Sequence, residues 1–331
     1  MTLIPKPLDV FESKQELEAR LSEVERQLQS FEEEFSDHPK SSLARYQAYV
    51  TRNIAALEQD KQALEEELQE LVLQFELLGK LHTKIPELTA YRIQRSLAAY
   101  PFWATCRQKQ TLSYRYESSN GQTWLEVYPN TAFGQATARD SSILSVIISY
   151  AKEIQLKHGS IPYFIPITRY KLLNSLGRAD GGKQYRELGL ALDRLTSTFY
   201  KGNIFGESVF RGTLLSIHSQ EDPDGPENIL FVLDPTIRMA LGGKLVYALP
   251  KQILLDDSLL RQEVAKKVWI HLGKQQKWQI SLEQFSKMVS YHGSLRHFKH
   301  ELSKYEDFFR SWFTVQTKGR GRETMLVFSK M

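Results

Sequence analysis

One order of secondary-structure elements occurs twice in this 331-residue chain, from about residue 138 to the C-terminal end. In the first copy, the spacing of apolar residues predicts a helix over 139–158, followed by a short, proline-flanked extended segment. The remaining predicted elements of this copy are helices over 168–176 and 181–196 and β-rich segments over 209–218 and 229–233. The segment 221–226 between the last two is rich in Asp, Pro and Gly, which is typical of a turn.

The second copy repeats this order with different residues. Its predicted elements are a helix over 258–272, a short strand over 278–280, helices over 281–289 and 294–308, and a hairpin with strands over 313–315 and 325–328. The first helix after the short strand opens with Ser281-Leu282-Glu283-Gln284, a capping-box pattern. The hairpin tip, 318–322, alternates cationic residues with glycines.

A helix, a short strand, a helix–turn–helix and a β-hairpin follow one another in this way in winged-helix domains. The second helix of the helix–turn–helix enters a DNA major groove. Because the order occurs twice, we predict an α+β, mainly α fold with two tandem winged-helix domains, at 81–235 and 236–331. The first would carry an N-terminal strand extension, and the cationic flanks of both second helices would face one surface.

The front of the chain has a different pattern, in which apolar residues recur at heptad spacing. After a tail at 1–10, two such seams are separated by the Pro-containing segment 36–42, and Gly79 is predicted to end the second. The first seam consists of Leu17, Leu21, Val24, Leu28, Phe31 and Phe35, and the second of Leu57, Lys61, Leu64, Leu68, Leu71, Phe75 and Leu78. This pattern predicts a coiled-coil helical hairpin over 11–80, which is either a solvated spacer or an arm for self-association or a partner.

Charge separates these two regions. Residues 1–80 hold 9 Lys and Arg against 17 Asp and Glu, whereas residues 81–331 hold 34 against 22, so a basic body suited to a polyanion follows an acidic front. The single cysteine, Cys106, excludes an internal disulfide and a Cys-based zinc site and favours a reducing compartment. The opening residues lack the apolar core of a secretory signal, and no apolar run is long enough for a membrane span, so we expect a cytoplasmic protein without membrane contact.

The candidate DNA-binding residues of the first copy lie on its third helix. Gly181 and Gly182 precede it, and free backbone N–H groups at such a helix start favour a phosphate. Arg and Lys suit guanine edges, and Gln suits adenine. The polar residues that lie mostly off the apolar stripe of this helix are Lys183, Gln184, Arg186 and Arg194.

The corresponding helix of the second copy is more basic. Its candidate DNA-binding residues are Arg296, His297, Lys299, His300 and Lys304, and the hairpin tip adds Lys318, Arg320 and Arg322. Arg-bearing turns of this kind enter a narrow minor groove or hold phosphates.

Motifs typical of enzymes are incomplete. The segment 177–184 approaches a phosphate-binding loop, but Gln184 stands where Ser or Thr must hold magnesium, and a predicted helix rather than a strand precedes it. His292, His297 and His300 have no acidic or thiol partner at metal-ligand spacing. We therefore expect no catalytic residues, no metal and no cofactor.

Several segments resemble the plasmid-encoded RepA-type replication initiators. They are Tyr100–Trp103, Trp124–Pro129, Phe133–Leu144, Gly181–Leu188, Leu192–Leu195 and Trp278–Leu282, within roughly residues 100–310. The resemblance implies two winged-helix domains that bind repeated origin sequences and start theta-type plasmid replication. It also implies a host initiator and a replicative helicase as partners, and often a dimer that represses its own gene. The acidic front departs from the family pattern, so dimerisation through the first winged helix, through the front, or through both stays open.

The sequence therefore favours a sequence-specific double-stranded DNA-binding initiator of plasmid replication, without catalytic chemistry, that binds repeated origin sites. One alternative is a transcriptional repressor or partition protein of the same architecture. A second is a coiled-coil scaffold whose basic body binds an acidic partner, and a third is a primase or nickase.

Overall fold

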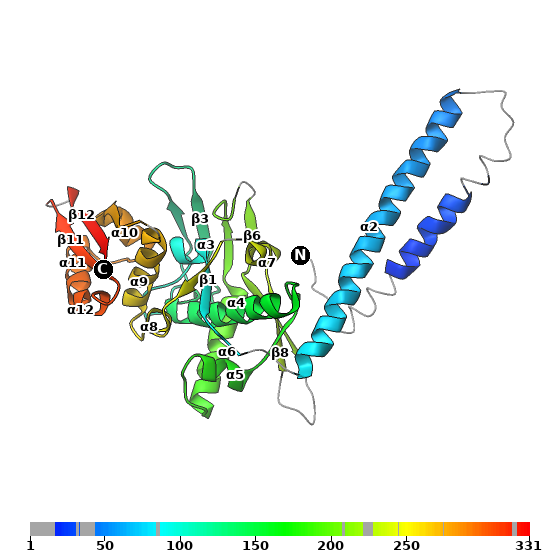
Figure 1. Ribbon diagram of the computed structural model, residues 1–331. Helices are drawn as coiled ribbons and strands as arrows, with labels where there is room; N and C mark the ends of the chain where they lie inside the picture. The colour runs from blue at the N-terminus through cyan, green and yellow to red at the C-terminus, as the bar shows by residue number, and fades with distance from the viewer. Residues whose placement is uncertain are drawn as a thin grey trace. The chain divides into compact units, whose positions relative to one another are not determined.

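A computed structural model describes residues 17–30, 33, 44–83, 87–206, 209–220, 228–243, 245–273, 275–319 and 323–331. The chain divides into two compact units, Met1–Thr83 and Lys84–Met331. Both expected winged-helix regions, 81–235 and 236–331, lie almost entirely within the second unit (Figure 1). No helix in the described part of the chain is long and apolar enough to cross a membrane.

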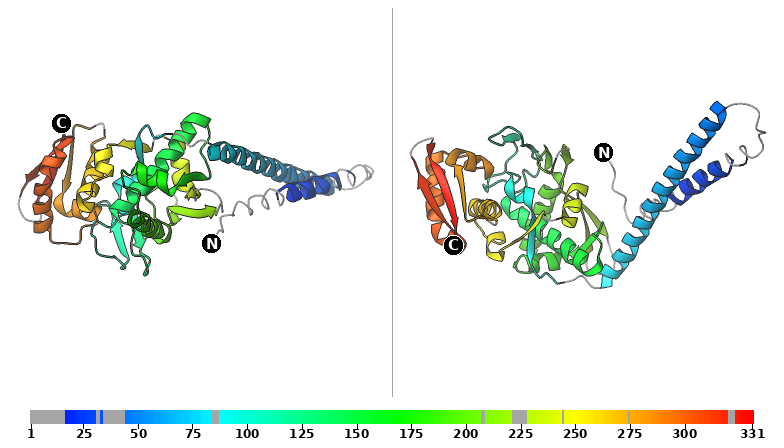
Figure 2. Two further views of the ribbon diagram at one scale, coloured as in Figure 1. Left: turned by 90° about the horizontal axis from the view of Figure 1, so that it is seen from below. Right: turned by 45° about the horizontal axis from the view of Figure 1, so that its top comes forward.

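The N-terminal unit contains two helical stretches, 17–30 and α2 (Ala44–Thr83), which lie side by side (Figures 1 and 2). Leu17 and Leu64 are buried, and Lys61 Nζ lies 3.0 Å from Glu25 Oε1, so the lysine within the apolar seam is held by a carboxylate from the other stretch. The prediction that Gly79 ends the second helix is wrong, because α2 continues to Thr83 and a helix tolerates an internal glycine at a cost of about 1 kcal/mol. Phe31, Phe35 and the segment 36–42 lie outside the described residues.

The larger unit begins with elements that the repeat does not include. β1 (Tyr91–Gln94) leads into α3 (Arg95–Ala99), and β2 (Tyr114–Glu117) and β3 (Trp124–Tyr128) form a hairpin. β1 pairs with β9 (Val246–Leu249) from the middle of the chain. β2 and β3 join β5 (Phe199–Gly202) and β6 (Phe210–Gly212) in a sheet of order β2-β3-β5-β6.

The first copy of the repeated order comprises α4 (Ala138–His158), β4 (Ile165–Thr168), α5 (Arg169–Ser175), α6 (Gly182–Ser197), β7 (Leu215–Gln220) and β8 (Asn228–Leu233). Its sheet has the order β4-β8-β7, with Ile165 opposite Phe231. The prediction of one continuous β-rich segment over 209–218 is wrong. These residues divide between β6 and β7, which belong to different sheets.

The second copy comprises α9 (Leu259–Leu272), β10 (Lys277–Ser281), α10 (Leu282–Met288), α11 (Leu295–Lys304), β11 (Phe313–Lys318) and β12 (Met325–Lys330). Its sheet order, β10-β12-β11, matches that of the first copy. The predicted helix over 294–308 is interrupted at Tyr305, after which α12 (Glu306–Phe309) forms a separate turn.

α9, the first element of the second copy, lies between the first copy and the rest of the second copy, with α7 (Pro235–Gly242) and α8 (Lys251–Leu254) preceding it in the chain (Figures 1 and 2). It is buried on nearly all sides, and the charged side chains of Glu263, Lys266 and Lys267 are each at most 1% exposed. Lys267 Nζ donates to Tyr100 O at 2.7 Å and lies 3.0 Å from Glu263 Oε2. Charges buried this deeply are stable only when they are paired and hydrogen-bonded, so this cluster ties α9 to the first half of the unit.

Candidate nucleic-acid interface

The helix pair α5–α6 of the first copy is defined by its caps and by one turn. Thr168 is the last residue of β4 and also the N-cap of α5, where its Oγ1 accepts from Lys171 N at 3.1 Å. Gly177 provides the turn after α5 with φ of 64°, a conformation that favours glycine. Gly181 is the N-cap of α6. Because glycine has no side chain, this residue makes no cap hydrogen bond to the first backbone N–H groups of α6.

The basic residues at the start of α6 face away from its core. Leu188, Ala191, Leu192 and Leu195 bury the opposite stripe. Lys183 is 78% exposed, with Nζ 3.9 Å from Glu187 Oε1, and Arg186 is also exposed. Gln184 is half-buried.

Arg194 has a different role from the one expected. Its Nε and Nη2 donate to Oδ2 and Oδ1 of Asp140 at 2.7 and 2.8 Å, and Asp140 is 1% exposed. Burial alone would lower the pKa of Arg194, but the hydrogen bonds and charge of Asp140 outweigh it and raise that pKa. The bidentate ion pair holds the Arg194 guanidinium at the start of α4, so this side chain supports the fold rather than projecting from α6 as the sequence predicted.

The second helix pair, α10–α11, is built in the same way. Ser281 ends β10 and caps α10, with Oγ accepting from Gln284 N at 3.1 Å, and Ser294 caps α11 by accepting from His297 N at 3.2 Å. Ser290 in the turn has φ of 51°, a left-handed conformation that is uncommon for a non-glycine residue. Phe298 and Leu302 bury the inner face of α11.

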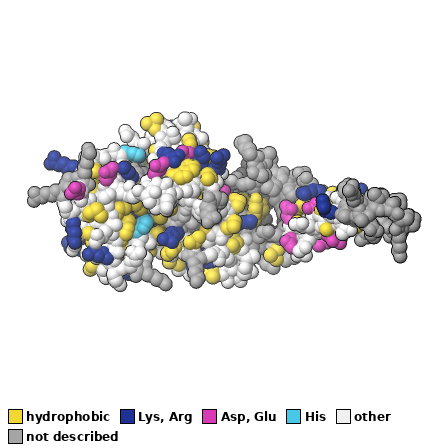
Figure 3. Space-filling model, turned by 90° about the horizontal axis from the view of Figure 1, so that it is seen from above, with side chains coloured by type: hydrophobic (Ala, Val, Ile, Leu, Met, Phe, Trp, Pro, Cys, Tyr) yellow, Lys and Arg dark blue, Asp and Glu magenta, His cyan; other side chains and the backbone are white. Residues whose placement is uncertain are grey.

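The outer face of α11 carries three free basic side chains. Arg296, Lys299 and His300 are exposed and make no ion pair with any described residue. Figure 3 shows several Lys and Arg side chains at the left end of the larger unit and another group over its middle. These three positions lie on the face of α11 opposite the buried Phe298 and Leu302.

Two other predicted residues of α11 are partly engaged within the protein. Lys304 Nζ lies 2.6 Å from Glu301 Oε1, and this hydrogen bond holds the pKa of Glu301 below its usual value. His297 is hydrogen-bonded through Nδ1 to the hydroxyl of Tyr291, and its Nε2 lies 3.6 Å from Glu301. Both side chains stay more than half exposed, so these bonds orient them without removing them from the surface.

The β11–β12 hairpin follows α11 and α12 in the sequence, and the predicted cationic tip joins its two strands. Lys318 is exposed, and Gly319 takes φ of 80° at the start of the turn. Arg320 and Arg322 lie outside the described residues, as does the tip of the β7–β8 hairpin.

Sequence reasoning missed a hollow of mixed charge that adjoins α11, whose lining includes Asp257 and Glu301. It has a volume of about 450 Å³, and Arg107, Arg261, Tyr291, His297 and Tyr305 are among its lining residues. Arg261 donates to Asp256 at 2.6 and 2.7 Å, and its guanidinium lies 4.6 Å from the centre of the Phe308 ring. Arg107 belongs to the first half of the unit, so no local pattern could have placed it beside α11.

The turn of the second helix pair is anchored on β2. The hydroxyl oxygen of Tyr114 lies 3.2 Å from Ser290 Oγ, within hydrogen-bond distance. Gln284 Nε2 donates to the Tyr116 hydroxyl at 3.1 Å. Burial raises the pKa of Tyr114 to about 12, so the hydroxyl stays protonated and able to donate. Thr105 Oγ1 donates to Ser290 O at 3.0 Å. The first half of the unit therefore positions the second helix pair.

Among the described residues, no group of three or more His, Cys, Asp and Glu side chains could hold a metal ion. The arrangement offers instead two exposed helix faces with basic side chains, each preceded by a tight turn. Such faces bind polyanions through charge and hydrogen bonds.

Comparison with solved structures shows a related fold. The chain is similar to a crystal structure of domains 2 and 3 of RctB, with 14% identity, a TM-score of 0.51, and coverage of 69% of this chain and 94% of that one. A second RctB structure, of domains 2–3, matches with 14% identity, a TM-score of 0.47, and coverage of 71% and 96%. The first likeness shows a shared fold. No curated protein matches the sequence.

The family comparison covers most of the larger unit. The model of the family described as Replication initiator protein A matches residues 92–307, which is more than half of the chain. This range includes both helix pairs, and it confirms the resemblance to plasmid-type replication initiators. The chain belongs to the replication initiator protein A family.

Proposed function

We propose that this protein is a sequence-specific double-stranded DNA-binding initiator of plasmid replication that binds repeated origin sites. The observation that carries the proposal is the repeated topology: two helix pairs with matching sheet orders each expose basic side chains on their second helix. In this proposal α4–β8 and α9–β12 are tandem winged-helix domains, with α6 and α11 as recognition helices on one surface.

The polar groups have separate roles in this proposal. Lys183 and the uncapped start of α6 hold a phosphate, while Arg186 and Gln184 face base edges. On α11, Arg296, Lys299 and His300 make the main contacts, with His297 and Lys304 at the margin. Lys318 and the arginines of the tip hold the backbone or the minor groove. The protein itself supplies no catalytic group, so strand opening and synthesis require partners, among them a host initiator and a replicative helicase.

The N-terminal unit has a separate role in the proposal. The ion pair between Lys61 and Glu25 supports a coiled-coil hairpin, whose acidic surface suits an arm for a partner or for self-association through its apolar seam better than a DNA contact. The protein would act in the cytoplasm, where plasmid DNA is replicated.

A plasmid-establishment assay tests the function. A DNA circle without another origin, carrying this gene and its flanking sequence, should be maintained in a permissive host. The double substitution Arg296→Ala and Lys299→Ala should abolish maintenance, whereas Lys277→Ala, which removes an exposed cation from β10, should not. Regulation of the gene's own promoter without maintenance of the circle would instead indicate a repressor.

A further inference from the structure

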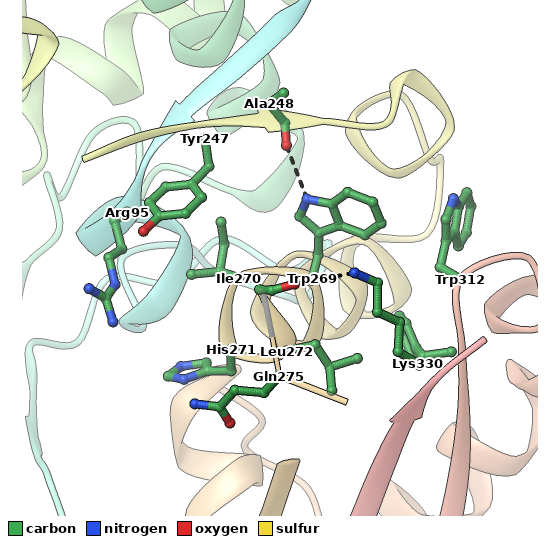
Figure 4. A pocket seen from close by; sticks show the side chains of 12 residues that line it. Arg95, Tyr247, Ala248, Trp269, Ile270, His271, Leu272, Gln275, Trp312 and Lys330 are labelled. Carbon is green, nitrogen blue, oxygen red and sulfur yellow. Dashed lines mark hydrogen bonds between the residues drawn. The ribbon is translucent and has the colours of Figure 1, made fainter. Parts of the chain in front are cut away.

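A second hollow lies at the opposite end of α9 from the recognition helix α11. Its volume is about 520 Å³, within the range of ligand-binding clefts. It is lined by Arg95 at the start of α3, by Tyr247 of β9, by the C-terminal turn of α9, and by Trp312 and Lys330 from the C-terminal part of the second copy (Figure 4). It is therefore a junction hollow, built where α3 and β9 meet α9 and the C-terminal elements of the second copy.

Aromatic rings make up much of its wall. Tyr247, Trp269 and Trp312 all line the hollow, and each is half-buried. Trp269 Nε1 donates to Ala248 O at 3.0 Å, which fixes the orientation of its indole ring (Figure 4). The Trp312 ring packs edge-on against Phe308 at 5.1 Å. Rigid, half-exposed aromatic rings in a concave wall provide a large apolar contact at small entropic cost.

The charges around the hollow have one sign. Arg95 and Lys330 are exposed at its edge, and Lys330 Nζ donates to Gly273 O at 3.4 Å (Figure 4). None of the described lining residues is Asp or Glu. An occupant with carboxylates would therefore meet no negatively charged side chain among these residues.

The position of the hollow separates it from the proposed DNA face. Ser258 and Arg261, at the start of α9, line the hollow beside α11, whereas Trp269 and Leu272 line this one. A helix of 14 residues spans about 21 Å at 1.5 Å per residue. An occupant here can be held while α11 contacts DNA.

We propose that the junction hollow is a docking site for an acidic peptide segment of a partner protein. The segment would insert one large apolar side chain against Trp269 and Trp312 and place its carboxylates near Arg95 and Lys330. The charge complementarity of the edge and the apolar wall favour this occupant. A single strand of nucleic acid is less favoured, because two cations do not form the basic track that follows a phosphate backbone.

Fluorescence anisotropy with a labelled peptide, Asp-Asp-Phe-Asp-Asp, tests the site on the full chain. We expect the peptide to bind, and the double substitution Arg95→Gln and Lys330→Gln to weaken binding by at least about tenfold. The matched control Lys277→Gln removes an exposed cation outside the lining and should leave binding unchanged. Replacing the central Phe of the peptide by Ala should weaken binding by a similar factor.

Three results would overturn the proposal: no binding of the peptide to the wild type, equal binding by the wild type and the double variant, or equal binding of the Phe and Ala peptides. Displacement of the peptide by a thymidine dodecamer at low concentration would assign the hollow to single-stranded DNA instead. A salt titration of the wild type makes the electrostatic test without any substitution, because binding through Arg95 and Lys330 must weaken as salt rises. Plasmid maintenance is a separate readout, so this site and the proposed function can fail independently.

Discussion

The two copies of the repeated order share a sheet topology and differ in how they use their basic side chains. In the first copy Arg194 holds the start of α4 through Asp140, which leaves Lys183 and Arg186 as the exposed cations of α6. In the second copy the ion pair of α11, between Lys304 and Glu301, lies at the surface. Arg296, Lys299 and His300 make no ion pair with any described residue. The difference teaches that, in one topology, a basic residue of the second helix can either stabilise the fold or stay exposed at the surface. It predicts that α11 contributes more to DNA affinity than α6.

The internal ion pair of the first copy gives the largest expected effect. Asp140→Asn leaves the Arg194 guanidinium half-buried without its countercharge, and it weakens the capping box at Thr137. We expect the free energy of unfolding to fall by about 3 kcal/mol in urea denaturation. The corresponding change at the surface of the second copy, Glu301→Gln, should cost less than about 1 kcal/mol. Equal losses at the two sites would contradict the distinction between a supporting and a surface pair.

The free cations of the second copy give the next largest effect. The double substitution Arg296→Ala and Lys299→Ala should weaken binding to origin DNA by on the order of 100-fold at moderate salt. The matched pair on α6, Lys183→Ala and Arg186→Ala, should weaken it by about tenfold, because Glu187 lies 3.9 Å from Lys183 Nζ and already offsets part of its charge. Gel-shift titrations on one DNA fragment measure both, and a larger loss from the α6 pair would reverse the comparison.

Acid should destabilise the packing of α9 against β10 within the second copy. His271 stacks on Trp278 at 4.4 Å, and burial, helped by the charges of Lys267 and Arg95, lowers its pKa to about 4. The unfolded chain takes up this proton near its ordinary pKa of about 6.5, so stability falls as pH drops from 6.5 toward 4. The loss should be on the order of 2 kcal/mol and should disappear in His271→Phe. Urea denaturation across this pH range measures it, and His292→Phe, at an exposed histidine, should leave the loss in place.

The substitution Lys183→Ala should have the smallest effect on DNA affinity, and it tests whether Lys183 contacts a phosphate. A phosphate contact carries no sequence information, so Lys183→Ala should weaken binding to specific and random DNA alike, by less than about tenfold. The slope of log affinity against log salt should become shallower by about 0.9. A change in base preference at one position of the site would show instead that Lys183 reads a base.

The order of elements could be predicted from local signals, because caps and apolar periodicity act within a few residues. Thr168, Ser281 and Ser294 cap the helices that their positions predict. Strand pairing could not be predicted, since Ile165 pairs with Phe231 and the segment 209–218 serves two sheets.

The site shows the same limit. The exposure of Arg296 and Lys299 follows from the buried stripe of Phe298 and Leu302 on the same helix. The role of Arg194 depends on Asp140, which is 54 residues away in the sequence. Contacts that are distant in sequence decide which basic residues are free.

Footprinting on the DNA upstream of this gene tests the central claim most directly, because it reports where α6 and α11 contact one duplex. Two protected major-groove segments on one face of the DNA, about 10 base pairs apart from centre to centre, are the result expected of two recognition helices. The Arg296→Ala and Lys299→Ala variant should lose one segment and the Lys183→Ala and Arg186→Ala variant the other. A single protected segment that both variants weaken equally would contradict two separate recognition helices.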